Sequence, residues 1–151
     1  MDKTFCGLIA FAIAWFIAQL WKMIAGAVAN RKQMQSMNLA QLIGYFTRSG
    51  GMPSGHTASL TGMLVYFGCL DGFNSAIFLL GFGLWTIVVY DAIHVRYAVG
   101  EQGKALNRLL AQNGETELPI VEGHTVPQVI VGALMGIAVG LWMAYFTGIL
   151  A

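Results

Sequence analysis

The sequence predicts an all-α integral membrane protein, a four-transmembrane-helix bundle with one or two short interfacial or re-entrant helices. Three observations predict it. The 151 residues are 57% apolar and only 10% charged, whereas about a quarter of the residues in a soluble domain are charged. The mean hydropathy is +0.67. The apolar residues gather in stretches of the length that crosses a bilayer. The net charge of +1 also excludes nucleic-acid binding through a basic surface.

The first two predicted spans differ in length. The first covers about residues 5–29, and only Gln19 and Lys22 interrupt its apolar run. About 20 residues of helix cross the hydrocarbon core, so this segment is long enough. The second predicted span covers about residues 57–73 and is shorter, with hydroxyl side chains in its first turns.

The third and fourth predicted spans begin at recognisable helix starts. The third covers about residues 75–96, and Ser75 is suited to cap its first turn. The fourth covers about residues 127–150, and Pro127 fits the first turn of a helix. Small residues at four-residue spacing form a smooth face on this span, which predicts close helix packing and would also tolerate a homodimer: Gly132, Gly136 and Gly140.

Two polar segments, about 30–56 and 100–126, connect the spans and lie on one side of a four-span protein. In the first, an apolar stripe from Leu39 to Phe46 predicts a short amphipathic helix at the interface. Six cations lie on this side: Arg31, Lys32, Arg48, Arg96, Lys104 and Arg108. The opposite side has only Lys3. The positive-inside rule therefore predicts that the polar side is the cytoplasmic face of the cell inner membrane.

Two histidines stand at the mouths of predicted spans on this same side. His56 ends a glycine-rich run that leads into the second span, and His124 lies just before the fourth. His94 follows Asp91 by three residues within the third span. Two opposed imidazoles can share one reaction, because a neutral one attacks phosphorus while a protonated one donates to the leaving oxygen.

The surroundings of these histidines suit a phosphate. Glycines beside His56 allow the backbone to approach a ligand, and the N–H groups at a helix start attract anions. Four cations lie near enough in the predicted topology to balance phosphate charge: Lys22, Arg31, Arg48 and Arg96. Lys22 is near the cytoplasmic end of its helix, where its side chain can also simply reach to the interface.

At this point the motifs resemble a known family. Gly-Gly-Met-Pro-Ser-Gly-His-Thr-Ala at 50–58 resembles the Pro-Ser-Gly-His motif of the type 2 phosphatidic acid phosphatase superfamily, which includes vanadium haloperoxidases. Gly123-His124-Thr125 with Gly132 resembles its third motif. The segment from Tyr90 to Gln102 is similar to the divergent branch, in which the arginine of the third motif is separated from the histidine. The resemblance covers the whole chain, as one membrane phosphatase-like domain, 1–151.

The resemblance implies a phosphatase that needs no metal or other cofactor and passes through a phosphohistidine. His124 would be the nucleophile and His56 the general acid. The phosphoryl oxygens would be held by a larger set: Ser54, Gly55, Arg96, Lys22 and Arg31. The match of the last two is poor, because the family places that arginine seven residues after the lysine and follows it with proline, whereas here the gap is nine and Lys32 follows.

Gln128 stands where the superfamily has a carboxylate that orients the nucleophilic imidazole. A glutamine can accept a hydrogen bond but brings no negative charge to stabilise the imidazolium. Asp91 is our preferred substitute, with Glu101 and Glu122 as alternatives, because a carboxylate within a membrane helix needs a cationic or histidine partner. The structural alternative for Asp91 is an ion pair with Arg96 or a bond to His94.

The predicted substrate is a phosphomonoester or pyrophosphate of a phospholipid or isoprenoid, for example phosphatidylglycerol phosphate or a prenyl phosphate. The first alternative is a catalytically weak or inactive membrane scaffold that binds lipid phosphate, which Gln128 favours. A second adds Mg²⁺, held by Asp91, Glu101, Glu122 and the histidines. A transporter is disfavoured, because four spans show no inverted repeat.

Overall fold

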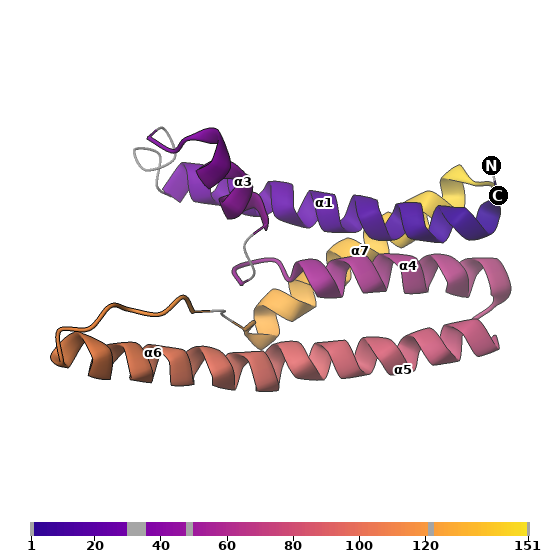
Figure 1. Cartoon of the computed structure of the whole chain (residues 1–151). Helices are drawn as coiled ribbons and strands as arrows, with labels where there is room; N and C mark the ends of the chain where they lie inside the picture. The colour runs from indigo at the N-terminus through magenta and orange to yellow at the C-terminus, as the bar shows by residue number, and fades with distance from the viewer. Residues whose placement is uncertain (1, 30–35, 48–49, 121–122, 151) are drawn as a thin grey trace.

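The computed structural model describes residues 2–29, 36–47, 50–120 and 123–150, and throughout them the regular structure is helical. The all-α prediction is confirmed. Figure 1 shows the long helices running alongside one another, with both termini at one end and the tip of α6 beyond the other. The helices are α1 (Lys3–Ala29), α3 (Leu39–Thr47), α4 (Gly55–Asp71), α5 (Ala76–Tyr90), the π-helix η1 (Asp91–Val95), α6 (Arg96–Gln112) and α7 (Val126–Phe146).

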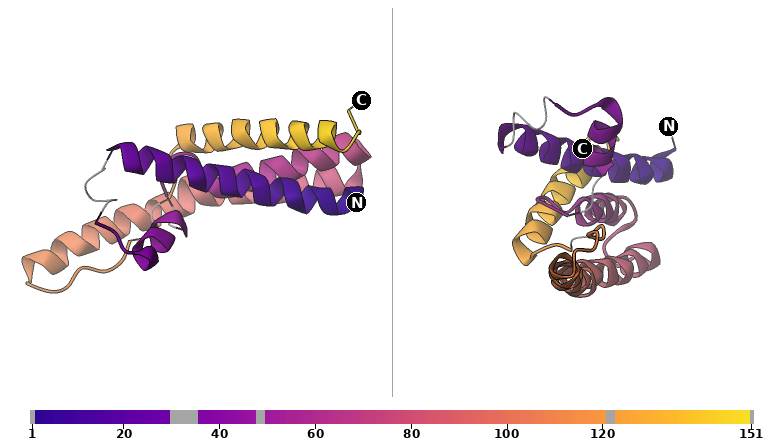
Figure 2. Two further views of the ribbon diagram at one scale, coloured as in Figure 1. Left: turned by 90° about the horizontal axis from the view of Figure 1, so that it is seen from above. Right: turned by 60° about the vertical axis from the view of Figure 1, so that its left-hand side comes forward.

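Three helices of the described residues are long and apolar enough to cross a membrane: α1, the continuous helix Ala76–Gln112, and α7. The second predicted span corresponds to α4, which has 17 residues and is about 26 Å long. That is slightly less than the ~30 Å hydrocarbon core. Because α4 packs against α1, α5 and α7, it lies inside the bundle (Figure 2). The four-span topology stays a prediction.

The contact between α4 and α7 is the most extensive in the molecule, and glycines make it possible. A Cβ atom added to Gly136 would lie 2.4 Å from the carbonyl oxygen of Ala58. Gly132 and Gly140 are equally close to the backbone of α4, at 2.5 Å from the Ser54 oxygen and 2.6 Å from the Gly62 oxygen. The predicted packing role of this glycine face is therefore confirmed.

On its other side, α4 packs against small residues of α1. Three alanines of α1 are fully buried there: Ala10, Ala14 and Ala18. Two hydrogen bonds tie α4 to its neighbours, because its buried polar groups need partners away from water. The Tyr66 hydroxyl donates to the Lys3 carbonyl at 2.8 Å, and the Trp85 indole donates to the Thr61 hydroxyl at 2.8 Å.

The third long helix differs from the sequence expectation. Polar residues predicted an end near Arg96, but the helix continues from Ala76 to Gln112 through a π-helical turn. Residues 96–112 are rich in good helix formers and contain no proline, so propensity carries the helix into the polar segment. The helix ends at Gln112, and the chain turns away at Gly114, which has φ of +73°. There the Glu115 amide donates to the Leu110 carbonyl at 2.9 Å and closes a Schellman motif.

The predicted short amphipathic helix is confirmed as α3. The Asn38 side chain accepts from the Gln41 amide at 2.9 Å, and the Gln41 side chain accepts from the Asn38 amide at 2.9 Å. This reciprocal cap starts the helix. Phe46 packs edge-on against Trp15 of α1, with ring centroids 5.7 Å apart, and also contacts Phe16, so α3 lies against the middle of α1.

Candidate functional site

The two glycine-rich motifs meet where α4 and α7 begin. The Ser54 amide donates to the Gln128 carbonyl at 3.0 Å, so the two helix starts are joined directly. Ser54 is buried and caps α4, because its hydroxyl oxygen accepts from the Thr57 amide at 3.4 Å and from the Thr57 hydroxyl at 3.0 Å. The first N–H groups of α4, those of Gly55 and His56, therefore form the anion-attracting helix start that the motif predicted.

The π-helical turn fixes the backbone of His124. In a regular α-helix, the Arg96 amide would donate to the Ala92 carbonyl, but in η1 it donates to the Asp91 carbonyl instead. The Ala92 carbonyl then accepts from the His124 amide at 3.0 Å. Gly123 permits this approach, since an added Cβ would lie 2.2 Å from the Tyr97 amide nitrogen. The fold thus brings the two separated parts of the third motif together.

A second contact anchors the chain that leads to His124. Asn107 of α6 is buried and holds Leu118 with two hydrogen bonds, one to its carbonyl at 2.8 Å and one from its amide at 2.9 Å. Ile120 also lies against Gly103 of α6. The segment before His124 is therefore attached to α6 at several points.

His124 itself is 3% exposed. Its Nδ1 atom lies 3.3 Å from Gln128 Oε1, which also accepts from the Thr125 amide at 3.0 Å. Because an amide oxygen only accepts, the contact with Gln128 favours a proton on Nδ1, and the ring also hydrogen-bonds to the Gly51 backbone. Burial lowers the pKa of His124; the hydrogen bonds to Gln128 and to the Gly51 backbone raise it, and the charges of Lys22 and His56 lower it. Burial is the largest of these effects, so the neutral form is favoured.

Charged groups surround the pair of histidines. The charges of Lys22 and His56 act on His124, and those of Arg96, Lys22 and Asp91 act on His56. Five of the predicted site residues thus lie near enough for their charges to influence one another, and within this set Asp91 and Arg96 are in direct contact. His56 is exposed and Lys22 is half-buried, whereas His124 is buried, so the accessible face of the site is on the His56 side.

Asp91 has a different partner from the one we preferred. Its carboxylate forms an ion pair and hydrogen bond with Arg96, the structural alternative that the sequence left open. Gln128, not Asp91, contacts the imidazole of His124. His94 stacks on the ring of Tyr90 with centroids 4.3 Å apart and is exposed. The predicted role of Asp91 in orienting His124 has no direct contact to support it.

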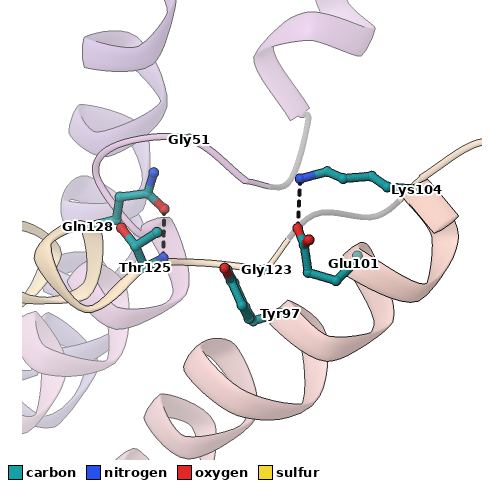
Figure 3. A pocket seen from close by; sticks show the side chains of 8 residues that line it. Gly51, Tyr97, Glu101, Lys104, Gly123, Thr125 and Gln128 are labelled. Atoms are coloured by element: carbon teal, nitrogen blue, oxygen red, sulfur yellow. Dashed lines mark hydrogen bonds and ion pairs between the residues drawn. The ribbon is translucent and has the colours of Figure 1, made fainter.

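A pocket of about 160 Å³ adjoins the site, between the starts of α6 and α7. In Figure 3, Gln128 and Thr125 stand on one side and the Glu101–Lys104 ion pair, at 3.0 Å, on the other, with Tyr97 between them. Its lining is polar or glycine apart from the tyrosine ring: Gly51, Tyr97, Gly100, Glu101, Lys104, Gly123, Thr125 and Gln128. The pocket can therefore admit the polar part of a ligand beside Gln128.

Some predicted residues fall outside the described part of the chain. Arg31, Arg48 and Glu122 are among these, so their predicted roles stay predictions. Within the described residues, no three His, Cys, Asp or Glu side chains gather as a metal site. Sequence reasoning did not single out Tyr97, and it read Lys104 only as a topology signal. The Thr125–Gln128 capping box could have been found, because its Thr-x-x-Gln pattern is visible in the sequence.

Comparison with known proteins agrees with these motifs. The model of the divergent PAP2 family matches residues 5–139. The chain belongs to the divergent PAP2 family. One relative is the uncharacterized membrane protein YuiD of Bacillus subtilis (strain 168), 28% identical over 156 residues, covering 92% of this chain and 94% of its own. No solved structure matches. This member of the divergent PAP2 family is therefore a membrane protein, and the resemblance read from its motifs is confirmed.

Proposed function

We propose that the protein is a membrane lipid phosphatase that works through a phosphohistidine. The observation that carries this proposal is the state of His124. Its Nδ1 atom lies 3.3 Å from Gln128 Oε1 and its ring is buried, which supports a neutral imidazole that uses Nε2 as the nucleophile. Glutamine takes the place of the family's carboxylate in orienting the ring, a role that a buried aspartate has beside the histidine of the serine-protease triad.

The reaction then runs in two steps. His124 Nε2 attacks phosphorus, the bond from phosphorus to the alcohol oxygen breaks, and His56 in its protonated form gives that oxygen a proton. Water next attacks the phosphohistidine while neutral His56 takes its proton, the P–N bond breaks, and inorganic phosphate leaves. Both histidines end in their starting states.

The charges at the site suit the phosphoryl group. The anion-attracting start of α4 carries His56, and Lys22 and Arg96 lie near enough to influence that histidine. Preorganised donors and cations of this kind stabilise charge that spreads over the phosphoryl oxygens. Ser54, Gly55 and Arg96 are the groups we assign to these oxygens, together with Lys22.

The proposed orientation places the site at the cytoplasmic face of the cell inner membrane. The charge bias of the sequence supports it, since the cations of residues 96–108 belong to the end of the bundle that holds the site. The substrate would then be a phosphomonoester or pyrophosphate of a phospholipid or isoprenoid that is made in the inner leaflet. Its acyl or prenyl chain would lie in lipid and its phosphate at the helix starts.

A second candidate function is a lipid-phosphate-binding scaffold that turns over slowly or not at all. Gln128 favours it, because the amide contacts His124 at 3.3 Å but carries no charge to stabilise the imidazolium. The anion site and cations would still bind phosphate in such a protein.

Phosphate release by the purified protein separates these functions. The substrates are phosphatidic acid, phosphatidylglycerol phosphate, prenyl phosphates and prenyl pyrophosphates in detergent, each with and without chelator. We expect release by the wild type, insensitivity to chelator, and loss of release in His124→Ala and His56→Ala. The matched control is His94→Ala, because His94 is exposed and stacks on Tyr90, away from the proposed reaction. Release that survives His124→Ala contradicts the nucleophile; binding without release from any substrate supports the scaffold.

A further inference from the structure

One buried polar group is left without a partner. Gln19 lies within α1 and is 4% exposed, and its Oε1 atom accepts no hydrogen bond. It is the one such side-chain atom among the residues that the structure describes. The other buried polar side chains with known contacts, such as Ser54, Thr61 and Asn107, are hydrogen-bonded. An unpaired polar group in a membrane helix is costly, so Gln19 calls for a partner that the chain itself does not supply.

The carboxamide lies at the start of α4. Its Oε1 atom is 3.9 Å from the point where a Cβ atom on Gly55 would sit, and the Trp15 ring covers the same point at 3.6 Å. Gly55 is the first residue of α4, and its neighbour Thr57 already uses its amide in the Ser54 cap. The unpartnered side chain and the helix start therefore face one small region of the α1–α4 contact.

The same face of α1 carries the cation of the site. Lys22 follows Gln19 by three residues, which places both on one side of the helix. The charge of Lys22 acts on both His56 and His124. Gln19 thus lies on the same face of α1 as Lys22, one turn further from the end of the bundle that holds the histidines.

We propose that Gln19 is a substrate-binding residue whose carboxamide hydrogen-bonds the phosphoryl group at the start of α4. The inference rests on the proposed function, because it assumes that this site receives a phosphate ester. A phosphoryl group supplies the missing partner, since a protonated phosphoryl oxygen donates to Oε1, and its unprotonated oxygens can accept from the Nε2 amide. Gly55, which has no side chain, lets the Gln19 carboxamide approach the start of α4 closely.

The test measures stability and phosphate binding together. The thermal midpoint of the full chain in detergent is followed at increasing concentrations of inorganic phosphate, for the wild type and Gln19→Leu. Removing an unsatisfied group does not destabilise the free protein, so the midpoint without phosphate stays equal or rises. The phosphate affinity falls about 10-fold or more, as for the loss of a hydrogen bond to a charged group. KM for the lipid phosphate rises by a similar factor.

The matched control is Thr61→Val, which removes a buried polar group that has a partner, the Trp85 indole at 2.8 Å. Its midpoint falls, while its phosphate affinity stays that of the wild type. A second variant, Gln19→Glu, keeps the size of the side chain and places a carboxylate beside the phosphate. It weakens phosphate binding more than Gln19→Leu does, because the two anions repel each other.

The outcomes separate this inference from the proposed function. A Gln19→Leu protein with a lower midpoint and unchanged phosphate affinity overturns the inference, because Gln19 is then only structural. If Gln19→Leu does not fold, wild-type affinity in Gln19→Glu overturns it equally. A wild type that neither binds nor releases phosphate overturns the proposed function, and the role of Gln19 with it. If the wild type binds and releases phosphate, and both Gln19 variants have the same phosphate affinity and KM as the wild type, only the role of Gln19 is overturned.

Discussion

The two halves of α4 differ in what holds them. Its middle, from Ala58 to Val65, contacts the glycines of α7 backbone to backbone, with almost no room for a side chain. Its start is held by directed hydrogen bonds, from Ser54 to Gln128 and from Thr57 to Ser54. Close packing against α7 continues to the start, where Gly132 lies against the Ser54 backbone, but the start adds these hydrogen bonds and carries the exposed His56.

The difference follows from what each half of α4 has to contact: neighbouring helices in the middle, and a ligand at the start. Between membrane helices there is little hydrophobic driving force, so close contact of small residues supplies the attraction. At the site, polar groups must remain available to a charged ligand, so the backbone is fixed by hydrogen bonds and the side chains are left for chemistry. Stability should therefore depend on the middle of α4, and activity on its start.

The largest effect should come from filling the close-packed half. In Gly136→Leu, the new Cβ meets the Ala58 carbonyl, a backbone atom that cannot turn aside. Overpacking of this kind costs about 3 kcal/mol or more, so we expect loss of the folded bundle in thermal denaturation and size-exclusion chromatography. The control is Gly83→Leu on α5, where an added Cβ meets nothing within 4 Å. Equal midpoints for the two variants would contradict the comparison.

The next largest effect should come from the docking of His124. In Gly123→Ala, the added methyl collides with the Tyr97 amide and displaces the loop from η1. A shift of about 1 Å at a catalytic group can cost ~100-fold in rate, so phosphate release should fall by about that factor while the thermal midpoint changes little. Gly103→Ala is the control, since its Cβ would be 3.4 Å from Ile120. A thermal midpoint that falls while phosphate release stays near the wild-type rate would contradict the prediction that the start of α4 governs activity and its middle governs stability.

A smaller effect is expected from restoring the carboxylate. In Gln128→Asp, the negative charge stabilises the imidazolium of His124, so the rate of phosphate release should rise, by about 10-fold as an order of magnitude. Gln128→Leu removes the acceptor and should lower it. Steady-state kinetics on both variants measures this. An unchanged rate in Gln128→Asp would mean that formation of the phosphohistidine does not limit turnover.

The smallest effect is a shift along the pH axis. The nucleophile must be neutral, so activity falls as the pH drops through the pKa of His124. Burial lowers this pKa below its ordinary value of 6.5, so the acid limb of kcat/KM should lie below pH 6.5. The carboxylate of Gln128→Asp raises the pKa and moves the limb to higher pH. Movement to lower pH would contradict the assignment of His124 as the group that must lose its proton.

Much of this organisation could be predicted from the sequence. The helical class follows from the composition, and the glycine face of α7 follows from its four-residue spacing. That His56 and His124 lie near enough for the charge of one to act on the other follows from their places at the starts of two helices. These features depend on local pattern and on the bilayer, both of which the sequence expresses directly.

Other features depend on contacts that no local pattern records. The polar residues after Arg96 predicted that the third span ends there, although helix propensity continues the same helix to Gln112. Asp91 was available to either Arg96 or His124, and only the fold determines which partner it reaches. Whether the Gln19 Oε1 atom has a hydrogen-bond partner depends on all the residues packed around it, and a sequence pattern does not record these neighbours.

The π-helical turn η1 also accommodates one extra residue within the long helix. A single π-helical turn takes up one residue more than an α-helical turn, so α5 and α6 keep the phase they would have without that extra residue. Deleting one residue of η1, such as Ile93, would restore an unbroken α-helix and leave the facing of both helices nearly as it is. The Ala92 carbonyl would then return to the helix ladder. A one-residue insertion, absorbed locally, is thus what separates an ordinary membrane helix from one whose Ala92 carbonyl can bind the loop at His124.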